Sequence, residues 1–521
     1  MKKLILALCL ILVAGALFAG VKGVVNLKPY FKFDNTPSAD VETDGYYNNI
    51  GWKKERGAQL DNWYMTKQDY WLEAFSNPNI LDLGFVAQGD KFGVVFIMDI
   101  QQDTLAYFMN GNNGNFSNIP FLKHMIELNF PRMGYIDYRS TDESLYLSVG
   151  RRQIKWGPGT YDMAIADSQP FLDSVIAQIN IPMKNGWKFW YSFTGIAYKY
   201  FLAYGKYVDA SYAADPDYET RGPKSTFAHK FSMENNHLRF SFAELNQVYG
   251  KDPSLLDFSP TVVWHDNYQD DFSNVMLSFT AEAKYGPVRG FANFTMDDYD
   301  LPHESGGDQK FNSSKPAAIG VAAGVEVNLL QGEEVKSSKF NYQDYAFREE
   351  TFKENTGLNI GYEIYYCSKF MYNRSHNIGK FTVPYQFISF AGRGYCFDEN
   401  AFYLGFKYGP DTLLHRLYVE YNNNPFSAHL SAELLRRGSY GIESPYDKDY
   451  FNANLETPYD LTSPVTTVLM LEGGASYYLQ EGFRIDASLG YTKDITHGTG
   501  AFKASVGAAI AVCDIDWANL F

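Results

Sequence analysis

Residues 275–297 give the clearest indication of the fold: Val275-Met-Leu-Ser-Phe-Thr-Ala-Glu-Ala-Lys-Tyr-Gly-Pro-Val-Arg-Gly-Phe-Ala-Asn-Phe-Thr-Met-Asp297. Each half alternates between apolar and polar side chains, and Gly286-Pro287 separates the halves. Such alternation predicts a β-strand with one apolar and one polar face, and a glycine next to a proline favours a turn. The stretch therefore predicts a hairpin of two long strands. Its apolar face carries Val275, Leu277, Phe279, Ala281, Val288, Ala292, Phe294 and Met296.

The same pattern recurs along most of the chain, for example in 81–100, 413–434 and 483–512. These strands run to about 10 residues, enough to cross a bilayer at a tilt, whereas strands of soluble sandwiches average about 5 or 6. Short turns at Gly89, Gly286 and 480–482 alternate with long polar segments, as in outer-membrane barrels. We therefore expect an all-β fold, an antiparallel transmembrane β-barrel of about 18 strands. The long segments are 104–120, 205–227, 298–315, 330–356 and 437–465, which we expect on the side opposite the short turns.

Composition agrees with a membrane barrel and excludes some partners. Aromatic residues make up 17% of the chain, with 40 Tyr and 40 Phe, and the mean hydropathy is −0.30. Abundant aromatic side chains in a polar chain are typical of the girdles at the two membrane interfaces. The net charge of −15 argues against nucleic acid as a partner. It also argues against a strongly acidic polymer, unless local arginines or divalent cations compensate.

The two ends of the chain carry export and assembly signals. Residues 1–19 combine a charged start with a short apolar run that ends in small residues, which predicts a secretory signal peptide and export. Export together with the strand pattern predicts localisation to the outer membrane. We expect 20–521 to form a single barrel domain. The last residues alternate up to the terminal Phe521, which resembles the signal read by the barrel-insertion machinery; the alternative is an ordinary frayed tail.

The sequence also predicts a helical element and allows one disulfide. Residues 51–75 read as one or two helices, a small helical element near the N-terminus. Cys367, Cys396 and Cys513 have no metal-type spacing, and one disulfide between two of them is an option in an oxidising compartment.

The segment Gly150-Arg-Arg-Gln-Ile-Lys-Trp-Gly-Pro-Gly159 ends an alternating strand in an aromatic corner. Glycines on either side of a proline allow positive φ and then fix the turn, so Trp156 and the two arginines are held on a rigid element. A flat aromatic ring beside fixed donors is a plausible sugar-contacting surface. The alternative is a tight turn with an anchoring indole.

This segment, followed by Asp167-Ser-Gln-Pro-Phe171, resembles the corresponding region of the capsule-assembly outer-membrane lectins of the Wzi type. Three later stretches fit the same pattern: 229–250, 282–298 and 404–411. The resemblance implies a monomeric barrel of 18 strands in contact with outer-membrane lipids, a helical bundle closing its periplasmic end, and a role in holding surface polysaccharide. The ligand-binding candidates, expected on the rim of the barrel, are Arg151, Arg152, Trp156, Tyr161 and Asp167.

The polar strand faces predict a lumen of mixed charge. Opposite charges across a barrel favour a packed, internally bridged interior, and an ion-selective pore is the alternative. The lumenal candidates are Glu282, Lys284, Arg289, Asp297, Arg416, Glu420, His429, Glu433, Glu472, Arg484, Asp486 and Lys503.

Two function classes remain open, a polysaccharide-binding barrel and a porin-type channel for small solutes. Motifs for serine hydrolases, zinc proteases and phosphate-cradling loops are absent from the sequence, so we expect no enzyme and no cofactor. Asp297 and Asp298 with Asp300 could bind a cation or act as paired carboxylates of a glycosidase. A solvated acidic loop is the simpler interpretation.

Overall fold

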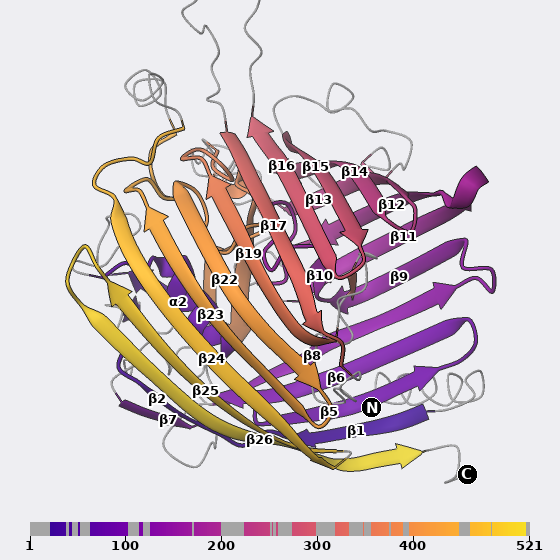
Figure 1. Cartoon of the computed structure of the whole chain (residues 1–521), viewed down its shortest axis with the longest axis horizontal. Coiled ribbons are helices and arrows are strands. Elements are labelled where there is room, and N and C mark those ends of the chain that lie inside the picture. The colour runs from indigo at the N-terminus through magenta and orange to yellow at the C-terminus, as the bar shows by residue number, and fades with distance from the viewer. Residues whose placement is uncertain are drawn as a thin grey trace, which may run out of the picture.

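Among the residues described by the computed structural model of this chain, eighteen strands form a closed antiparallel barrel (Figure 1). The structure describes residues 21–37, 41–43, 50–52, 63–102, 114–117, 126–168, 171–198, 223–250, 253, 257–258, 273–298, 318–332, 347–348, 356–374, 377–388, 395–446, 459–480 and 482–516. In wall order the strands are β1 (Val21–Leu27), β5 (Leu81–Gln88), β6 (Phe92–Gln102), β8 (Ile126–Arg139), β9 (Leu145–Arg152), β11 (Leu172–Pro182), β12 (Lys188–Ala197), β13 (Lys224–Glu234), β14 (Leu238–Tyr249), β15 (Ser273–Tyr285), β16 (Val288–Asp298), β17 (Ala318–Leu330), β19 (Gly357–Cys367), β22 (Thr412–Asn423), β23 (Phe426–Arg437), β24 (Thr466–Gln480), β25 (Phe483–Asp494) and β26 (Gly500–Asp516). Strand β26 pairs with β1 and closes the ring, which confirms the predicted fold class and strand number.

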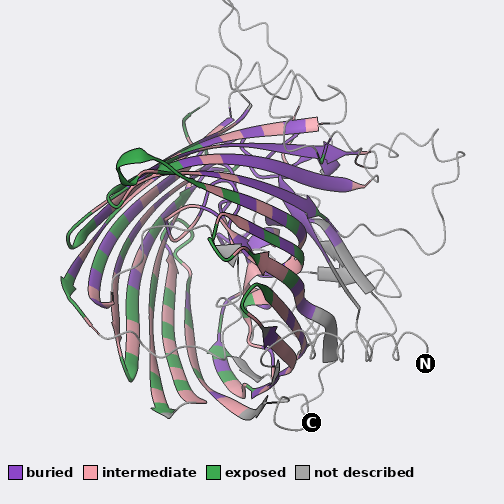
Figure 2. Ribbon diagram, turned by 90° about the vertical axis from the view of Figure 1, so that its right-hand side faces the viewer, coloured by how far each residue is buried: buried purple, intermediate pink, exposed green. Residues whose placement is uncertain are grey.

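The alternation predicted from the sequence decides which side chains face outward. On β15 the outward Phe279 is 45% exposed, whereas the inward Glu282 is only 3% exposed. Figure 2 shows exposed and buried residues alternating along the wall strands. Successive side chains of a strand point to opposite faces, so an apolar and polar alternation yields an apolar outer surface and a polar lumen.

The turns at 89–91, 286–287 and 481–482 all lie at the end of the barrel where β1 begins and β26 finishes, here called the short-turn end. At the opposite end, called the long-loop end, β6, β12, β16 and β23 finish and β8, β13, β17 and β24 begin, so the four connections between these strands start and end there. The expectation for 330–356 was wrong, because Leu330 pairs with Leu358 beside the short-turn end. Part of this connection folds back along the barrel, and β18 (Phe347–Arg348) pairs in parallel with β10 (Ile154–Lys155).

Several elements lie inside or beside the wall. Two connections fold inward: the inner loop, residues 153–168 between β9 and β11, and the inner segment, described at 368–374, 377–388 and 395–411 between β19 and β22. Together with residues 63–66 and helix α2 (Lys67–Ser76) they form what we call the plug. The inner segment contains η7 (Asn377–Gly379), β20 (Thr382–Ile388) and β21 (Tyr395–Tyr403). The remaining elements are β2 (Tyr30–Asp34), β3 (Val41–Thr43), β4 (Ile50–Trp52), β7 (Gly114–Ser117) and η1 (Lys184–Gly186).

Helix α2 confirms the predicted helical element and narrows its bounds. Thr66 and Asp69 bond reciprocally to each other's backbone N–H groups as a capping box, which starts the helix at Lys67. The helix ends at Ser76, because Pro78 disfavours helical geometry at the residue before it. Residues 50–52 form β4 instead. The helix bonds to Arg437, the last residue of β23, so it lies toward the long-loop end and not at the periplasmic end that the family resemblance implied.

Some sequence expectations fall on residues outside this description. The signal peptide, Phe521, Asp300 and the side chains of Cys396 and Cys513 are among them. Cys367 is buried with a free thiol, so it takes no part in a disulfide. Within the described residues, no helix is both long and apolar enough to cross a membrane.

Candidate functional site

Two glycines with positive φ lie near the start of the inner loop, one of them in the last part of β9. Gly150 has a φ of +135°, and a Cβ added there would lie 2.2 Å from the carbonyl oxygen of Gly134 on the neighbouring strand. Two residues later the chain turns into the lumen and reaches Gly157, whose φ is +72°. Both positions require glycine, since a side chain is strained at positive φ. The backbone N–H of Trp156 then donates to the carbonyl of Ile165 at 2.9 Å, which closes the loop on itself.

Arg151 does not face the lumen. It lies on the same face of β9 as the outward Leu147 and Val149, and its guanidinium binds both carboxylate oxygens of Asp173 on β11, at 2.7 and 2.6 Å. Such a bidentate pair fixes both side chains, because the two N–H groups of Arg151 that point at Asp173 each have an acceptor. Arg151 therefore lies on the outer face of the wall, apart from the other four ligand-binding candidates.

Arg152 and Trp156 are buried and not on the rim, which corrects their expected placement. Arg152 donates to Tyr146 Oη at 2.7 Å and to Ser148 Oγ at 3.1 Å, and it stacks on the ring of Tyr135. Trp156 is 2% exposed, with the ammonium of Lys230 4.9 Å from its ring centroid. A buried ring with a cation over its face is already engaged, so the anchoring interpretation of Trp156 fits its surroundings better than sugar stacking.

Tyr161 and Asp167 lie closer to open space. The hydroxyl of Tyr161 donates to Glu433 Oε1 on β23 at 2.6 Å, and the ammonium of Lys407 sits 4.2 Å from the centroid of its ring. Asp167 lines the main cavity of the lumen, and its backbone oxygen accepts from Gln153 Nε2. Of the five candidates, Asp167 lines the cavity, and Tyr161 contacts two residues that line it, Glu433 and Lys407.

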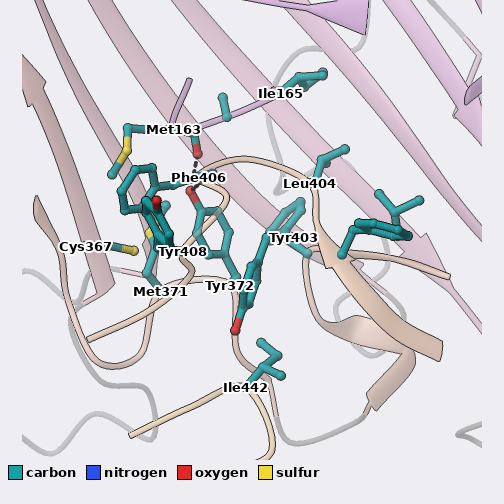
Figure 3. Packing of buried hydrophobic residues seen from close by; sticks show 14 of the residues in the cluster. Met163, Ile165, Cys367, Met371, Tyr372, Tyr403, Leu404, Phe406, Tyr408 and Ile442 are labelled. Carbon is teal, nitrogen blue, oxygen red and sulfur yellow. Dashed lines mark hydrogen bonds between the residues drawn. The ribbon is translucent and has the colours of Figure 1, made fainter. Parts of the chain in front are cut away.

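The inner loop and the inner segment hold each other through a buried tyrosine. Tyr372, fully buried, donates from its hydroxyl to the carbonyl of Met163 at 2.6 Å and accepts from the N–H of Phe406 at 2.9 Å (Figure 3). The carbonyl of Leu404 accepts from Ala166 N–H. The stretches 150–171 and 404–411, both singled out by the family resemblance, are therefore in contact.

The other two stretches of the resemblance bind the same loop from the wall. Lys230, in 229–250, covers Trp156. Arg289, in 282–298, pairs with Glu282 at 2.9 Å and donates to the carbonyl of Pro158 at 2.7 Å. Asp297 accepts from the N–H of Tyr372 at 2.7 Å, which gives this carboxylate a structural role. Among the described residues, no group of three His, Cys, Asp or Glu side chains is placed to hold a metal ion.

Helix α2 is fixed to the wall by ion pairs. Arg437 donates to both carboxylate oxygens of Asp69, at 2.5 and 3.2 Å, and to the carbonyls of Tyr64 and Tyr408. Glu73 pairs with Lys503 on β26 and with Lys32 on β2. The contacts of Asp69 with Arg437 and of Glu73 with Lys503 join segments more than 350 residues apart in the chain, so no local pattern of the sequence indicates them.

The internally bridged lumen predicted from the sequence is present among the described wall residues. Predicted lumenal side chains form ion pairs with one another or with the plug: Glu282 with Arg289, Arg416 with Glu433, Arg484 with Asp486 and Lys503 with Glu73. His429 and Glu472 remain exposed on the inner face. The lumen is thus packed near the plug and open to water along part of β23 and β24.

A cavity of about 700 Å³ lies between the plug and the wall. Its volume is in the range of pockets that bind small ligands. The sequence placed Glu433, Glu472, Arg484 and Lys503 in the lumen and Asp167 among the binding candidates, but it did not predict Glu73 or Phe75. Lys407 and Tyr408 belong to the stretch 404–411 that the resemblance singled out. The plug contributes Glu73, Phe75, Asp167, Lys407 and Tyr408, and the wall contributes Ser431, Glu433, Glu472, Arg484, Ser488 and Lys503.

Burial and charge move the pKa of two carboxyl groups of the plug in opposite directions. Burial raises the pKa of Asp162 to about 6, although the N–H groups of Ala164 and Ile165 donate to it. Burial also acts to raise the pKa of Glu73, but Lys503 and Lys32 outweigh it and lower that pKa to about 2. Glu73 therefore stays charged at any ordinary pH and keeps α2 attached to β26.

The pKa of Glu73 predicts a loss of plug stability in acid. A carboxyl group whose pKa falls on folding from 4.5 to about 2 stabilises the folded state fully above pH 4.5, and this contribution disappears as the pH falls toward 2. We expect the fluorescence of Trp71 and its neighbours to change in this window in the micelle-bound protein. Glu73→Gln should remove the change, whereas Glu143→Gln, an exposed turn residue, should keep it. Identical profiles for both variants would contradict the role of Glu73.

The fold and lumen define the class of this protein. A closed barrel satisfies every wall strand's hydrogen bonds in a medium that offers none, and outward Leu, Val, Ile and Phe side chains are suited to hydrocarbon. The chain is an outer-membrane β-barrel with an internal plug, located in the outer membrane.

Comparison with family models finds no matching family, and comparison with curated proteins finds no relative. Among solved structures, the chain is similar to Wzi of Escherichia coli, an outer-membrane protein involved in group 1 capsule assembly and a carbohydrate-binding β-barrel. The identity is 13% and the TM-score 0.48, over 94% of this chain and 84% of that chain. It is also similar to OccK3 (OpdO) of Pseudomonas aeruginosa, with 8% identity and a TM-score of 0.40 over 94% and 96% of the two chains. A loop L8 deletion mutant of OmpT of Vibrio cholerae gives 9% and 0.33, over 94% and 99%. The assignment of this chain to the outer-membrane β-barrels rests on its own barrel structure and not on these similarities.

Proposed function

We propose that this outer-membrane barrel binds surface polysaccharide, with the lumenal cavity as the place where a sugar segment is held. The observation that carries the proposal is the plug, which replaces an open lumen by a cavity of about 700 Å³. The cavity combines aromatic rings such as Phe75 and Tyr408 with hydroxyl, carboxylate and ammonium groups. Such mixed linings suit ligands that have both flat apolar faces and many hydroxyl groups. The resemblance of the sequence to the capsule-assembly lectins adds the object, a capsule-like polysaccharide.

We propose binding without catalysis. Glu433 is a wall carboxylate that lines the cavity, and both of its oxygens accept hydrogen bonds, from Tyr161 at 2.6 Å and Tyr408 at 2.7 Å. A carboxylate held in this way at both oxygens is suited to positioning rings and not to exchanging protons with a substrate. Incubation with the polysaccharide should release no reducing ends.

The experiment is retention of polysaccharide on the immobilised protein in detergent, combined with single-channel recording in planar bilayers. We expect retention of surface polysaccharide from the source cell and no stable conductance steps. Stable open-channel steps without retention would overturn the proposal. Heat-modifiable mobility on gels serves as the folding control for every preparation.

One observation favours a second candidate, a narrow solute channel. The cavity lining follows β25 from Arg484, near the short-turn end, to Thr492, near the long-loop end. A polar space that follows a wall strand for most of its length could guide small solutes past the plug. In this case the bilayer recordings should show small, stable steps that a soluble sugar ligand blocks.

A further inference from the structure

We propose that the outer wall formed by β23, β24, β25 and β26 binds a phosphate-bearing lipid of the outer membrane. One acyl chain of the lipid lies in a groove on the membrane-facing side, and Arg436 and Lys493 bind the phosphate. The groove and the lumenal cavity lie on opposite faces of the wall, so the inference does not depend on polysaccharide binding.

The groove is a depression of about 440 Å³ in the outer face of these strands, which lie side by side in the wall (Figure 1). Small side chains form its floor, because Gly473 and Ala475 on β24 lie next to Ala487 on β25. Larger apolar side chains surround the floor, and each of them is exposed and faces the membrane: Leu430, Leu471, Leu489, Tyr491 and Phe502. The alternate residues Glu472 and Ser488 face the lumen, so the outer side of the groove is apolar.

The dimensions of the groove suit one acyl chain. From Leu471 to Ala475 the groove follows β24 for about 13 Å, at 3.3 Å per residue. One leaflet of hydrocarbon is about 15 Å deep, half of the bilayer core. An acyl chain in the groove contacts the protein on several sides, whereas a chain on a smooth wall contacts it on one side only. The groove therefore favours one ordered chain over the surrounding lipid.

Two cations lie on the outer face between the groove and the long-loop end. Lys493 follows Tyr491 by two residues on β25, and it lies opposite Leu469 on β24. Arg436 on β23 lies opposite Thr467 on β24, two residues from Leu469 on the same face. The strand spacing places the Cα atoms of Arg436 and Lys493 about 12 Å apart, so both long side chains can reach one head group.

Neither cation forms an ion pair within the described part of the chain. Arg436 is exposed, and the ammonium of Lys493 donates one hydrogen bond, to the carbonyl of Gly498 at 2.6 Å. The residues that follow them, Arg437 and Asp494, point inward and pair with Asp69 and His497. Replacing the two outer cations therefore leaves the contacts of the plug in place.

The position of the two cations indicates a phosphate head group of the outer leaflet. In outer-membrane barrels the long loops are extracellular and the short turns are periplasmic. Arg436 and Lys493 lie near the long-loop end, where β23 and β25 finish. A guanidinium binds two phosphate oxygens at once, and an ammonium binds phosphate as a point charge. A basic pair next to an apolar groove thus matches a lipid that joins phosphate to acyl chains.

The charge is tested by fluorescence anisotropy of labelled lipid A, an acylated glucosamine disaccharide that carries phosphate, with the full-length protein in detergent. The wild type should bind phosphorylated lipid A about 10-fold or more tightly than the phosphate-free form, the ratio expected for charge-assisted hydrogen bonds. Arg436→Ala/Lys493→Ala should bind both forms with the affinity of the phosphate-free form. The control Lys184→Ala/Lys188→Ala removes two exposed lysines at the short-turn end and should bind as the wild type.

The groove is tested by filling it. Gly473→Leu places a Cβ 3.5 Å from Cδ1 of Leu430, an ordinary contact, so the wall tolerates the side chain that occupies the groove. The affinity for both forms of lipid A should fall about 10-fold, because displaced methylene groups lose their contact with the wall. Gly290→Leu is the matched control, since Gly290 lies on β16 outside the groove and its added Cβ meets only the carbonyl oxygen of Gly324, at 3.5 Å. Heat-modifiable mobility checks the folding of each variant.

Four outcomes would overturn the inference. Equal binding of the two forms by the wild type would remove the phosphate from the recognition, and an unchanged preference in Arg436→Ala/Lys493→Ala would remove these two residues. Equal affinities of Gly473→Leu and Gly290→Leu would remove the groove. Inorganic phosphate should not displace the lipid, because it has no acyl chain; displacement would indicate a site for free phosphate instead.

Discussion

Replacing Arg437 by alanine is expected to release helix α2 from the barrel wall while the barrel remains inserted. The substitution removes the bidentate ion pair with Asp69 and two hydrogen bonds to plug carbonyls, and it leaves the Asp69 carboxylate buried without its partner. Breaking a buried ion pair from one side costs about 3–5 kcal/mol. The loss falls on the plug, because the backbone pairing of β23 with β22 and β24 does not depend on this side chain.

The release is measured by limited proteolysis and by single-channel recording. Arg437→Ala should expose cleavage sites near 63–76 and raise the ion conductance of the barrel, with heat-modifiable mobility unchanged. Arg436→Ala is the matched control, because Arg436 is the preceding residue of β23 and is exposed. A protease pattern and conductance equal to those of the control would show that other contacts suffice to hold the helix.

Replacing Tyr372 by phenylalanine is expected to destabilise the contact between the inner loop and the inner segment. The ring keeps its volume, but the carbonyl of Met163 and the N–H of Phe406 each lose their partner in a fully buried place. A buried polar group left without a partner costs about 1–3 kcal/mol. The midpoint of urea denaturation, followed by tryptophan fluorescence, should fall accordingly, since Trp63, Trp71 and Trp156 all report on the plug.

Tyr403→Phe is the control for this effect. Tyr403 is 4% exposed and packs against Tyr372, with ring centroids 5.8 Å apart, but its hydroxyl makes no hydrogen bond within the described residues. The same atom is thus removed from the same cluster without breaking a bond, and we expect a change within about 0.5 kcal/mol. A similar loss in both variants would show that packing, and not hydrogen bonding, holds the two segments together.

The sequence predicted the wall of the barrel but not the contacts of the plug. Along β15, the alternation of Leu277, Phe279 and Ala281 with Ser278 and Glu282 predicted which residues face outward, and the structure agrees. The sequence also predicted the turn at Gly286-Pro287 and a helical element near the N-terminus, but not the capping box that starts the helix. Each of these features depends on neighbouring residues and on the contrast between lipid and water.

The sequence predicted only part of the candidate site. The sequence singled out Trp156 as a rim residue, whereas packing against Lys230 and the inner segment buries it. It paired Arg151 with Arg152, whereas the alternation of β9 places Arg151 on the outer face and Arg152 on the inner face.

The sequence by itself determined the barrel, its apolar outside and its polar lumen, because a strand's faces follow from the order of residues that are adjacent in the chain. Only the tertiary structure decided what fills the lumen. The contacts that do so join residues far apart, Asp69 with Arg437 and Tyr372 with Met163. These contacts depend on shape and charge in the folded lumen, and no local period of the sequence records them.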